Sequence, residues 1–242
     1  GLDMLSRFPH DAPWFLQVNF PSPHEPFDPP AEYLARYDGV EFPGPFDPDD
    51  RLTDAEHQAC RRGYAAMVEA VDAWCGRLIQ TVAERGELDQ TLIVYASDHG
   101  EMLGDHGRWG KSVYYEPSMG VPLIAAGPGV SGAGRVSDAL IELPDLGPTF
   151  LELAGLETPE DWEARSLARV FAGQTDEHRA FALSVLPGHR AICDGRYKLI
   201  YRDGQIPALF DLDSDPNETT NVTGEVPEVL TPLLQQLGEE MA

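Results

Sequence analysis

The chain has 242 residues with 17 basic and 41 acidic side chains, a formal net charge of −24 and a hydrophobic content of 42%. That hydrophobic content is sufficient for a globular core, and no apolar run reaches the roughly 18 residues that a transmembrane helix needs. A field this negative repels nucleic acids and anionic membrane surfaces, so we expect neither as a partner. Any anion-binding site must therefore be locally positive.

The first half of the chain predicts a strand, a loop and a long helix. Residues 14–20 are mostly apolar and predict a buried strand, and the proline-rich residues 21–30 then break regular structure. Thr53 and Glu56 form a capping-box pattern. Apolar residues at three-and-four spacing follow it, which predicts an amphipathic helix that ends near Gly86.

The second half predicts two further buried strands and then a small sheet. The apolar runs 91–96 and 121–126 predict the buried strands, and residues 144–154 and 163–172 predict short helices. Shorter elements separated by turn signals follow, namely strands at 180–186, 190–193, 197–202 and 208–212 and a last helix at 226–240.

These elements predict an α/β fold in two parts. Residues 1–177 form a partial, mostly parallel sheet flanked by helices, and residues 178–242 form a small antiparallel sheet with a helix.

The Ser97–Glu101 segment places Asp98 and His99 where a predicted buried strand ends and a glycine-rich loop begins. Open α/β sheets bind their ligands at the carboxyl ends of strands. A carboxylate beside an imidazole there can bind a divalent cation, although two ligands are too few for a tight site. A helix cap beside a packed histidine is the structural alternative.

Four further residues are candidates for binding an anion. Lys111 follows in the same glycine-rich loop, and it is one of only two lysines in the chain. His24 lies between prolines, where an imidazole can bind an anion or donate a proton to a leaving group. His106 can add an anion contact or an acid, and His189 can line the site. A surface position is the alternative for each of them.

Taken together and in this order, these segments resemble the sulfatase family of the alkaline-phosphatase-like superfamily. The segments that carry the resemblance are residues 15–20, Pro23-His24, and residues 90–101, 110–116, 121–124, 145–155, 165–167, 195–200 and 209–218. The resemblance implies that Asp98 and His99 bind the metal, with Ca²⁺ expected and Mn²⁺ or Mg²⁺ as alternatives. It also implies that Lys111 and His24 bind the sulfate, with His24 near the leaving-group oxygen.

Two features of the family have no match in the sequence. One is the strand that ends in paired aspartates. The other is the C-x-P-S-R-type segment whose cysteine or serine becomes the formylglycine nucleophile. Cys60, Cys75 and Cys193 fit no such segment, and because they form no C-x-x-C pair we expect free thiols.

The resemblance implies metal-dependent hydrolysis of small-molecule sulfate esters in a complete enzyme, and this chain alone is expected to be inactive. Phosphonate or phosphate ester hydrolysis is the alternative, as is a non-catalytic relative that binds an anion or metal. The open sheet predicts a covering partner: a missing N-terminal half, a separate chain or a second copy. The sequence leaves the compartment open between cytoplasm and periplasm or secretion.

Overall fold

A computed structural model describes residues 1–239, and the chain divides into two compact units. One unit contains residues 1–92 and 101–111, and the other contains residues 93–100 and the chain from Ser112 onward. The domain boundary expected between residues 177 and 178 stays a prediction.

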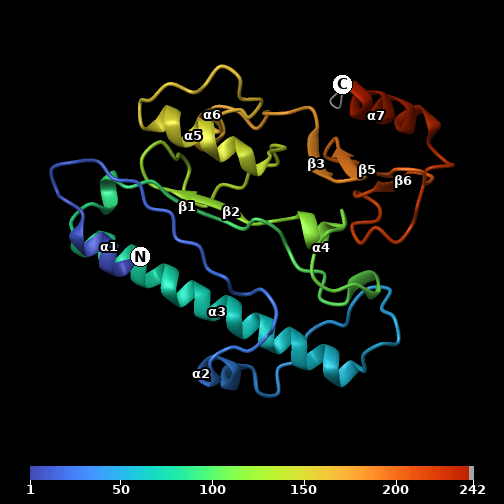
Figure 1. The fold of residues 1–242 in the computed structure, drawn as a ribbon, viewed down its shortest axis with the longest axis horizontal. Helices are drawn as coiled ribbons and strands as arrows, with labels where there is room; N and C mark the ends of the chain where they lie inside the picture. The colour runs from blue at the N-terminus through green and yellow to red at the C-terminus, as the bar shows by residue number, and fades with distance from the viewer. Residues whose placement is uncertain (240–242) are drawn as a thin grey trace. The chain divides into compact units, whose positions relative to one another are not determined.

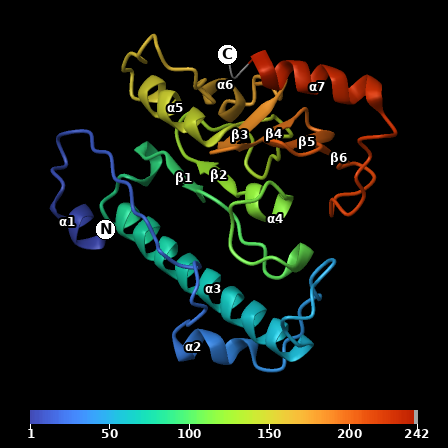
Figure 2. The ribbon, with the colours of Figure 1, turned by 45° about the vertical axis from the view of Figure 1, so that its right-hand side comes forward.

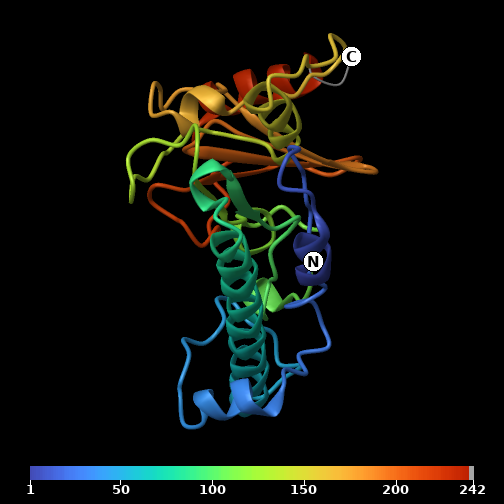
Figure 3. The ribbon, with the colours of Figure 1, turned by 90° about the vertical axis from the view of Figure 1, so that its left-hand side faces the viewer.

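The first unit is built on the long helix α3, Asp54–Glu84 (Figure 3). Its predicted capping box is confirmed: the Thr53 hydroxyl accepts from the Glu56 N–H at 3.4 Å, and the Glu56 carboxylate accepts from the Thr53 N–H at 2.8 Å. The helices α1 and α2 pack against α3. The other elements of this unit are α1 (Leu2–Arg7), α2 (Ala31–Leu34) and the 3-10 turns η1 (Ala35–Tyr37), η2 (Leu88–Gln90) and η3 (Asp105–Gly107).

The strand predicted over residues 14–20 is not formed, and this prediction was wrong. The residues alternate in exposure as a strand would, with Phe15 67% exposed. A strand exists only where ladder hydrogen bonds join it to a neighbour. No strand pairs with this segment in the described part of the chain.

In the second unit the expected strands at 91–96 and 121–126 form β1 (Ile93–Ala96) and β2 (Leu123–Ala126) (Figure 1). The two strands are antiparallel, with Val94 opposite Ala125, where parallel neighbours were expected. They are half-buried rather than buried, because one face packs on a cluster centred on Leu167, Val170 and Phe171 and the other is partly exposed. Short helices lie around them: α4 (Glu116–Met119), η4 (Leu143–Asp145), α5 (Leu146–Leu153) and α6 (Ala168–Phe171).

The C-terminal meander is confirmed as a four-stranded antiparallel sheet in the order β3-β4-β5-β6. Helix α7, Pro227–Glu239, packs on β4 and β5 (Figure 2). Its predicted end at residue 240 lies outside the described residues. The strands are β3 (Ala182–Leu186), β4 (His189–Cys193), β5 (Tyr197–Arg202) and β6 (Ala208–Asp211), and the core between sheet and helix contains Ile192, Leu199, Leu209, Leu233 and Leu237.

The mixed α/β class with a small C-terminal antiparallel sheet and helix is therefore confirmed. Among the described residues, no helix has both the length and the apolar character needed to cross a bilayer. The three cysteines are free thiols, as expected.

Candidate metal and anion site

The six predicted site residues fall in both units. Asp98, His99 and His189 belong to the unit with the sheets, and His24, His106 and Lys111 belong to the unit built on α3.

The Asp98–His99 loop begins where β1 ends, and its side chains are oriented by local hydrogen bonds. The Asp98 carboxylate accepts from the His99 N–H at 3.1 Å, and the Ser97 hydroxyl donates to the His99 carbonyl at 2.7 Å. The His99 Nδ1 lies 2.8 Å from the Gly100 carbonyl oxygen. Because a carbonyl can only accept, Nδ1 carries the proton and the lone pair is on Nε2.

This arrangement fits a divalent cation. His99 Nε2 and Asp98 Oδ2 lie 3.8 Å apart, so both atoms can reach one ion at metal–ligand distances of about 2.0–2.6 Å. A metal-binding histidine normally donates its other ring N–H to a carbonyl or carboxylate, which the Gly100 carbonyl provides here. Within residues 1–239 no third histidine, cysteine or acidic side chain joins this pair as a potential ligand.

His24 and Lys111 meet in the other unit, although 87 residues separate them in the sequence. The Lys111 Nζ lies 2.5 Å from the His24 Nε2, and the His24 Nδ1 lies 2.9 Å from the Glu25 carbonyl oxygen. The carbonyl requires the proton on Nδ1, so Nε2 accepts from the lysine. A positive charge and an imidazole therefore lie next to each other, and the anion-binding role predicted for them stays a prediction.

The loop that carries Lys111 is held by several polar and ring contacts. The Glu101 carboxylate accepts from the Gly110 N–H at 2.6 Å, and Arg61 of α3 pairs with Asp105 at 3.1 Å. Trp109 stacks on His57 of α3, with ring centroids 5.6 Å apart. The first contact closes the loop and the other two hold it against α3, so Lys111 extends from an ordered segment.

His106 and His189 occupy defined backbone positions. His106 has a left-handed φ of 53° in η3, and its N–H donates to the Phe46 carbonyl at 2.7 Å. His189 opens β4 opposite Leu186, and its carbonyl accepts from the Tyr114 hydroxyl at 2.7 Å. The roles predicted for their side chains stay predictions.

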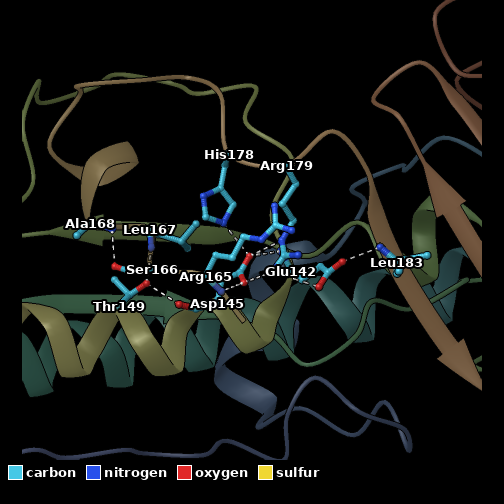
Figure 4. A network of polar contacts seen from close by, with 10 residues as sticks. All are labelled: Glu142, Asp145, Thr149, Arg165, Ser166, Leu167, Ala168, His178, Arg179 and Leu183. Carbon is cyan, nitrogen blue, oxygen red and sulfur yellow. Dashed lines mark hydrogen bonds and ion pairs between the residues drawn. The ribbon is translucent and has the colours of Figure 1, made fainter. Parts of the chain in front are cut away.

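Sequence reasoning missed two buried ionic clusters in the unit with the sheets. In the first, Asp145 is fully buried and is held by Arg179 and His178, with further bonds from two backbone N–H groups (Figure 4). In the second, Lys198 is 1% exposed and pairs with Glu218 at 2.9 Å. The signal available for the second was a lysine inside the apolar strand 197–202, where a charge needs a partner.

Two known families together match nearly the whole length of the sequence. Residues 2–156 match the sulfatase family, and residues 104–242 match the family described as "N-sulphoglucosamine sulphohydrolase, C-terminal". The chain belongs to the sulfatase family.

The similarity extends to curated sulfatases and to solved structures. Arylsulfatase K of Xenopus laevis is 34% identical over 73% of this chain and 36% of its own length. An arylsulfatase of Clostridium perfringens is 30% identical over 92% of this chain and 52% of its own length. The crystal structure of a phosphonate monoester hydrolase of Agrobacterium radiobacter has 26% identity and a TM-score of 0.87, over 98% of this chain and 58% of that one. The chain thus spans about a third to a half of the length of these two curated sulfatases.

Sulfatases are hydrolases that act on sulfate esters and typically depend on a metal. The match places this sulfatase chain in the alkaline-phosphatase-like superfamily, as its sequence motifs predicted.

Proposed function

We propose that this chain carries the anion-binding lysine and histidine and part of the metal site of a sulfate ester hydrolase. The observation that carries the proposal is the meeting of His24 and Lys111 in a protein with a net charge of −24. Since the overall field repels an anion, a sulfate group requires a locally positive site, which the Lys111 ammonium supplies beside the His24 ring. The ordered Lys111 loop supports the same role.

Each residue has a role that follows from its atoms. The Lys111 ammonium donates to a non-bridging oxygen of the sulfate, where charge develops as the ester bond breaks. Because Nδ1 of His24 is engaged by a carbonyl, its Nε2 is the atom that faces the leaving-group oxygen. His106 is proposed as a second acid or anion contact, and His189 as part of the substrate wall.

Asp98 and His99 are proposed to hold the metal, which supplies Lewis-acid stabilisation of the anion when bound. Ca²⁺ is the proposed ion, in line with the family resemblance. Mn²⁺ is the alternative that an imidazole ligand favours, and Mg²⁺ is a further one.

The nucleophile is proposed to lie outside the residues of this chain. Burial raises the pKa of all three cysteine thiols, which makes them poor nucleophiles. The outer face of the β1–β2 pair is exposed at Ile124 (62%) and Tyr95 (36%). We propose that an N-terminal half, a separate chain or a second copy covers this face, and that the chain alone has no turnover.

The alternative activity is hydrolysis of phosphonate or phosphate esters, which the similarity to a phosphonate monoester hydrolase structure favours. Both substrates present a tetrahedral anion to the same donors. Matched aryl sulfate and aryl phosphonate esters, assayed with the longer protein that the proposal implies, decide between them. Faster turnover of the sulfate supports the proposal, and faster turnover of the phosphonate supports the alternative.

The anion role of Lys111 is tested in the same assay. Lys111→Met is expected to lower kcat/KM by about 10²-fold, since it removes a donor to the developing charge. Arg7→Met removes the same charge from an exposed pair with Asp3 on α1 and serves as the control. Equal effects of the two variants would contradict a specific role for Lys111.

A further inference from the structure

A buried ionic cluster lies beside the Asp98–His99 loop and reaches it through helix α4. Lys198 of β5 pairs with Glu218 at 2.9 Å and also with the half-exposed Glu116. Both Lys198 and Glu218 are almost fully buried, at 1% and 2% exposure. Charges buried in this way are costly, and apolar residues of similar volume often serve stability equally well.

The geometry of Glu218 shows what the cluster holds. One carboxylate oxygen faces Lys198, and the other accepts from the backbone N–H of Glu116 at 2.6 Å. Glu218 reaches this place with a left-handed φ of 54°, a conformation that is uncommon for a residue other than glycine. Two points of Glu116, its backbone and its side chain, are thus fixed at the first turn of α4.

Helix α4 in turn touches the metal-binding loop. The Gly100 N–H donates to the Ser118 carbonyl at 2.7 Å. The approach is so close that a Cβ on Gly100 would lie 2.0 Å from the Pro117 carbonyl oxygen. Since the Gly100 carbonyl orients the His99 ring, the position of α4 determines where Nε2 points.

We propose that Lys198 and Glu218 are positioning residues that set the orientation of the Asp98–His99 loop through α4. They act on the loop without touching a substrate or a metal. Removing either one lets α4 shift, loosens the Gly100–Ser118 hydrogen bond and weakens the binding of a metal at the loop. The inference rests on the proposed metal role of Asp98 and His99.

The test uses the 242-residue chain and two NMR measurements, the hydrogen exchange rate of the Gly100 amide and the broadening of its signal by added Mn²⁺. Lys198→Met is expected to speed exchange of the Gly100 amide and to raise the Mn²⁺ concentration for half-broadening, the latter about tenfold, as for other residues that support metal ligands. Arg196→Met is the matched control, because Arg196 is 53% exposed and pairs with Asp211 next to the same strand. It is expected to change neither measurement.

A double variant, Lys198→Met with Glu218→Leu, separates positioning from folding. It leaves no unpaired buried charge, so it is expected to keep the fold and still to lose the protection of Gly100. A folded double variant with wild-type exchange at Gly100 would overturn the positioning role. If the wild-type chain shows no broadening with Mn²⁺, the proposed metal site fails, and the exchange rates still decide the positioning role.

Discussion

Replacing Asp145 with asparagine removes the charge at the centre of the first buried cluster. The carboxylate accepts from the Arg179 Nε at 2.9 Å and lies 3.1 Å from the His178 Nε2 (Figure 4). It also accepts from the backbone N–H groups of Arg165 at 2.8 Å and Glu142 at 3.0 Å. Glu142 bonds in turn to the N–H of Leu183 in β3, so the cluster joins the small sheet to α5.

The expected loss of stability is about 3 kcal/mol. Removing one partner of a buried ion pair costs about 3–5 kcal/mol, because the other charge remains buried. Arg179 is 9% exposed and would keep Glu142, at 3.4 Å, as a charged partner. That remaining contact and the amide oxygen of asparagine place the loss at the lower end of the range.

Urea unfolding followed by circular dichroism measures this loss. With an m-value of about 3 kcal/mol/M, the midpoint should fall by about 1 M. Asp211→Asn is the matched control, because Asp211 pairs with Arg196 through the same two guanidinium nitrogens, but that arginine is 53% exposed. Equal midpoint shifts in the two variants would refute the argument from burial.

The effect should also depend on pH. Burial alone would raise the pKa of Asp145, but hydrogen bonds from Arg179 and the two backbone N–H groups lower it below its ordinary value. A lowered pKa in the folded state stabilises the protein above about pH 4, and the contribution is lost as the pH falls through the folded value. The difference in free energy of unfolding between the wild type and Asp145→Asn should therefore become smaller as the pH falls below about 4.

Three further predictions concern the two units. Hydrogen bonds, above all from Arg85, lower the pKa of Glu87 from 4.5 to about 2. Glu87→Gln should therefore lower the free energy of unfolding at neutral pH, and this loss should disappear as the pH falls from about 4.5 towards 2. Urea unfolding at several pH values measures it. Gly76 of α3 faces open space, so Gly76→Ala should stabilise the protein by about 0.5–1 kcal/mol. Gly63→Ala in the same helix should not, because its Cβ would lie 3.0 Å from a backbone oxygen. Equal shifts of the thermal unfolding midpoint in the two variants would contradict this. Gly100→Ala should abolish Mn²⁺ broadening of the Asp98–His99 loop, because its Cβ would collide with a backbone carbonyl, and a wild-type response would refute that.

Local signals in the sequence predicted most elements. The capping box marks the start of α3, and the turns at Asp194-Gly195 and Asp203-Gly204 bracket β5, which spans Tyr197–Arg202 as expected. The strand predicted over residues 14–20 was wrong because strand pairing depends on a neighbouring strand, which the periodicity of one segment cannot reveal. The antiparallel β1–β2 pair was missed for the same reason, since apolar runs do not encode direction.

The roles of the candidate site residues stay predictions. Asp98-His99 and Lys111 are candidates because their types and spacing are chemical signals, and the structure places Lys111 against His24. The Lys198–Glu218 pair was missed because burial of a charge depends on a partner 20 residues away and on the packing around both. Charge burial becomes visible only once the fold is known.

Calorimetric titration of the chain with Ca²⁺ and Mn²⁺ tests whether Asp98 and His99 bind a metal ion. Weak binding is expected, because two ligands leave most of the coordination sphere to water. Asp98→Ala changes a side chain that is 89% exposed, so it is expected to remove the binding heat without unfolding the protein. A heat of binding that survives unchanged in Asp98→Ala would contradict the assignment of the metal site.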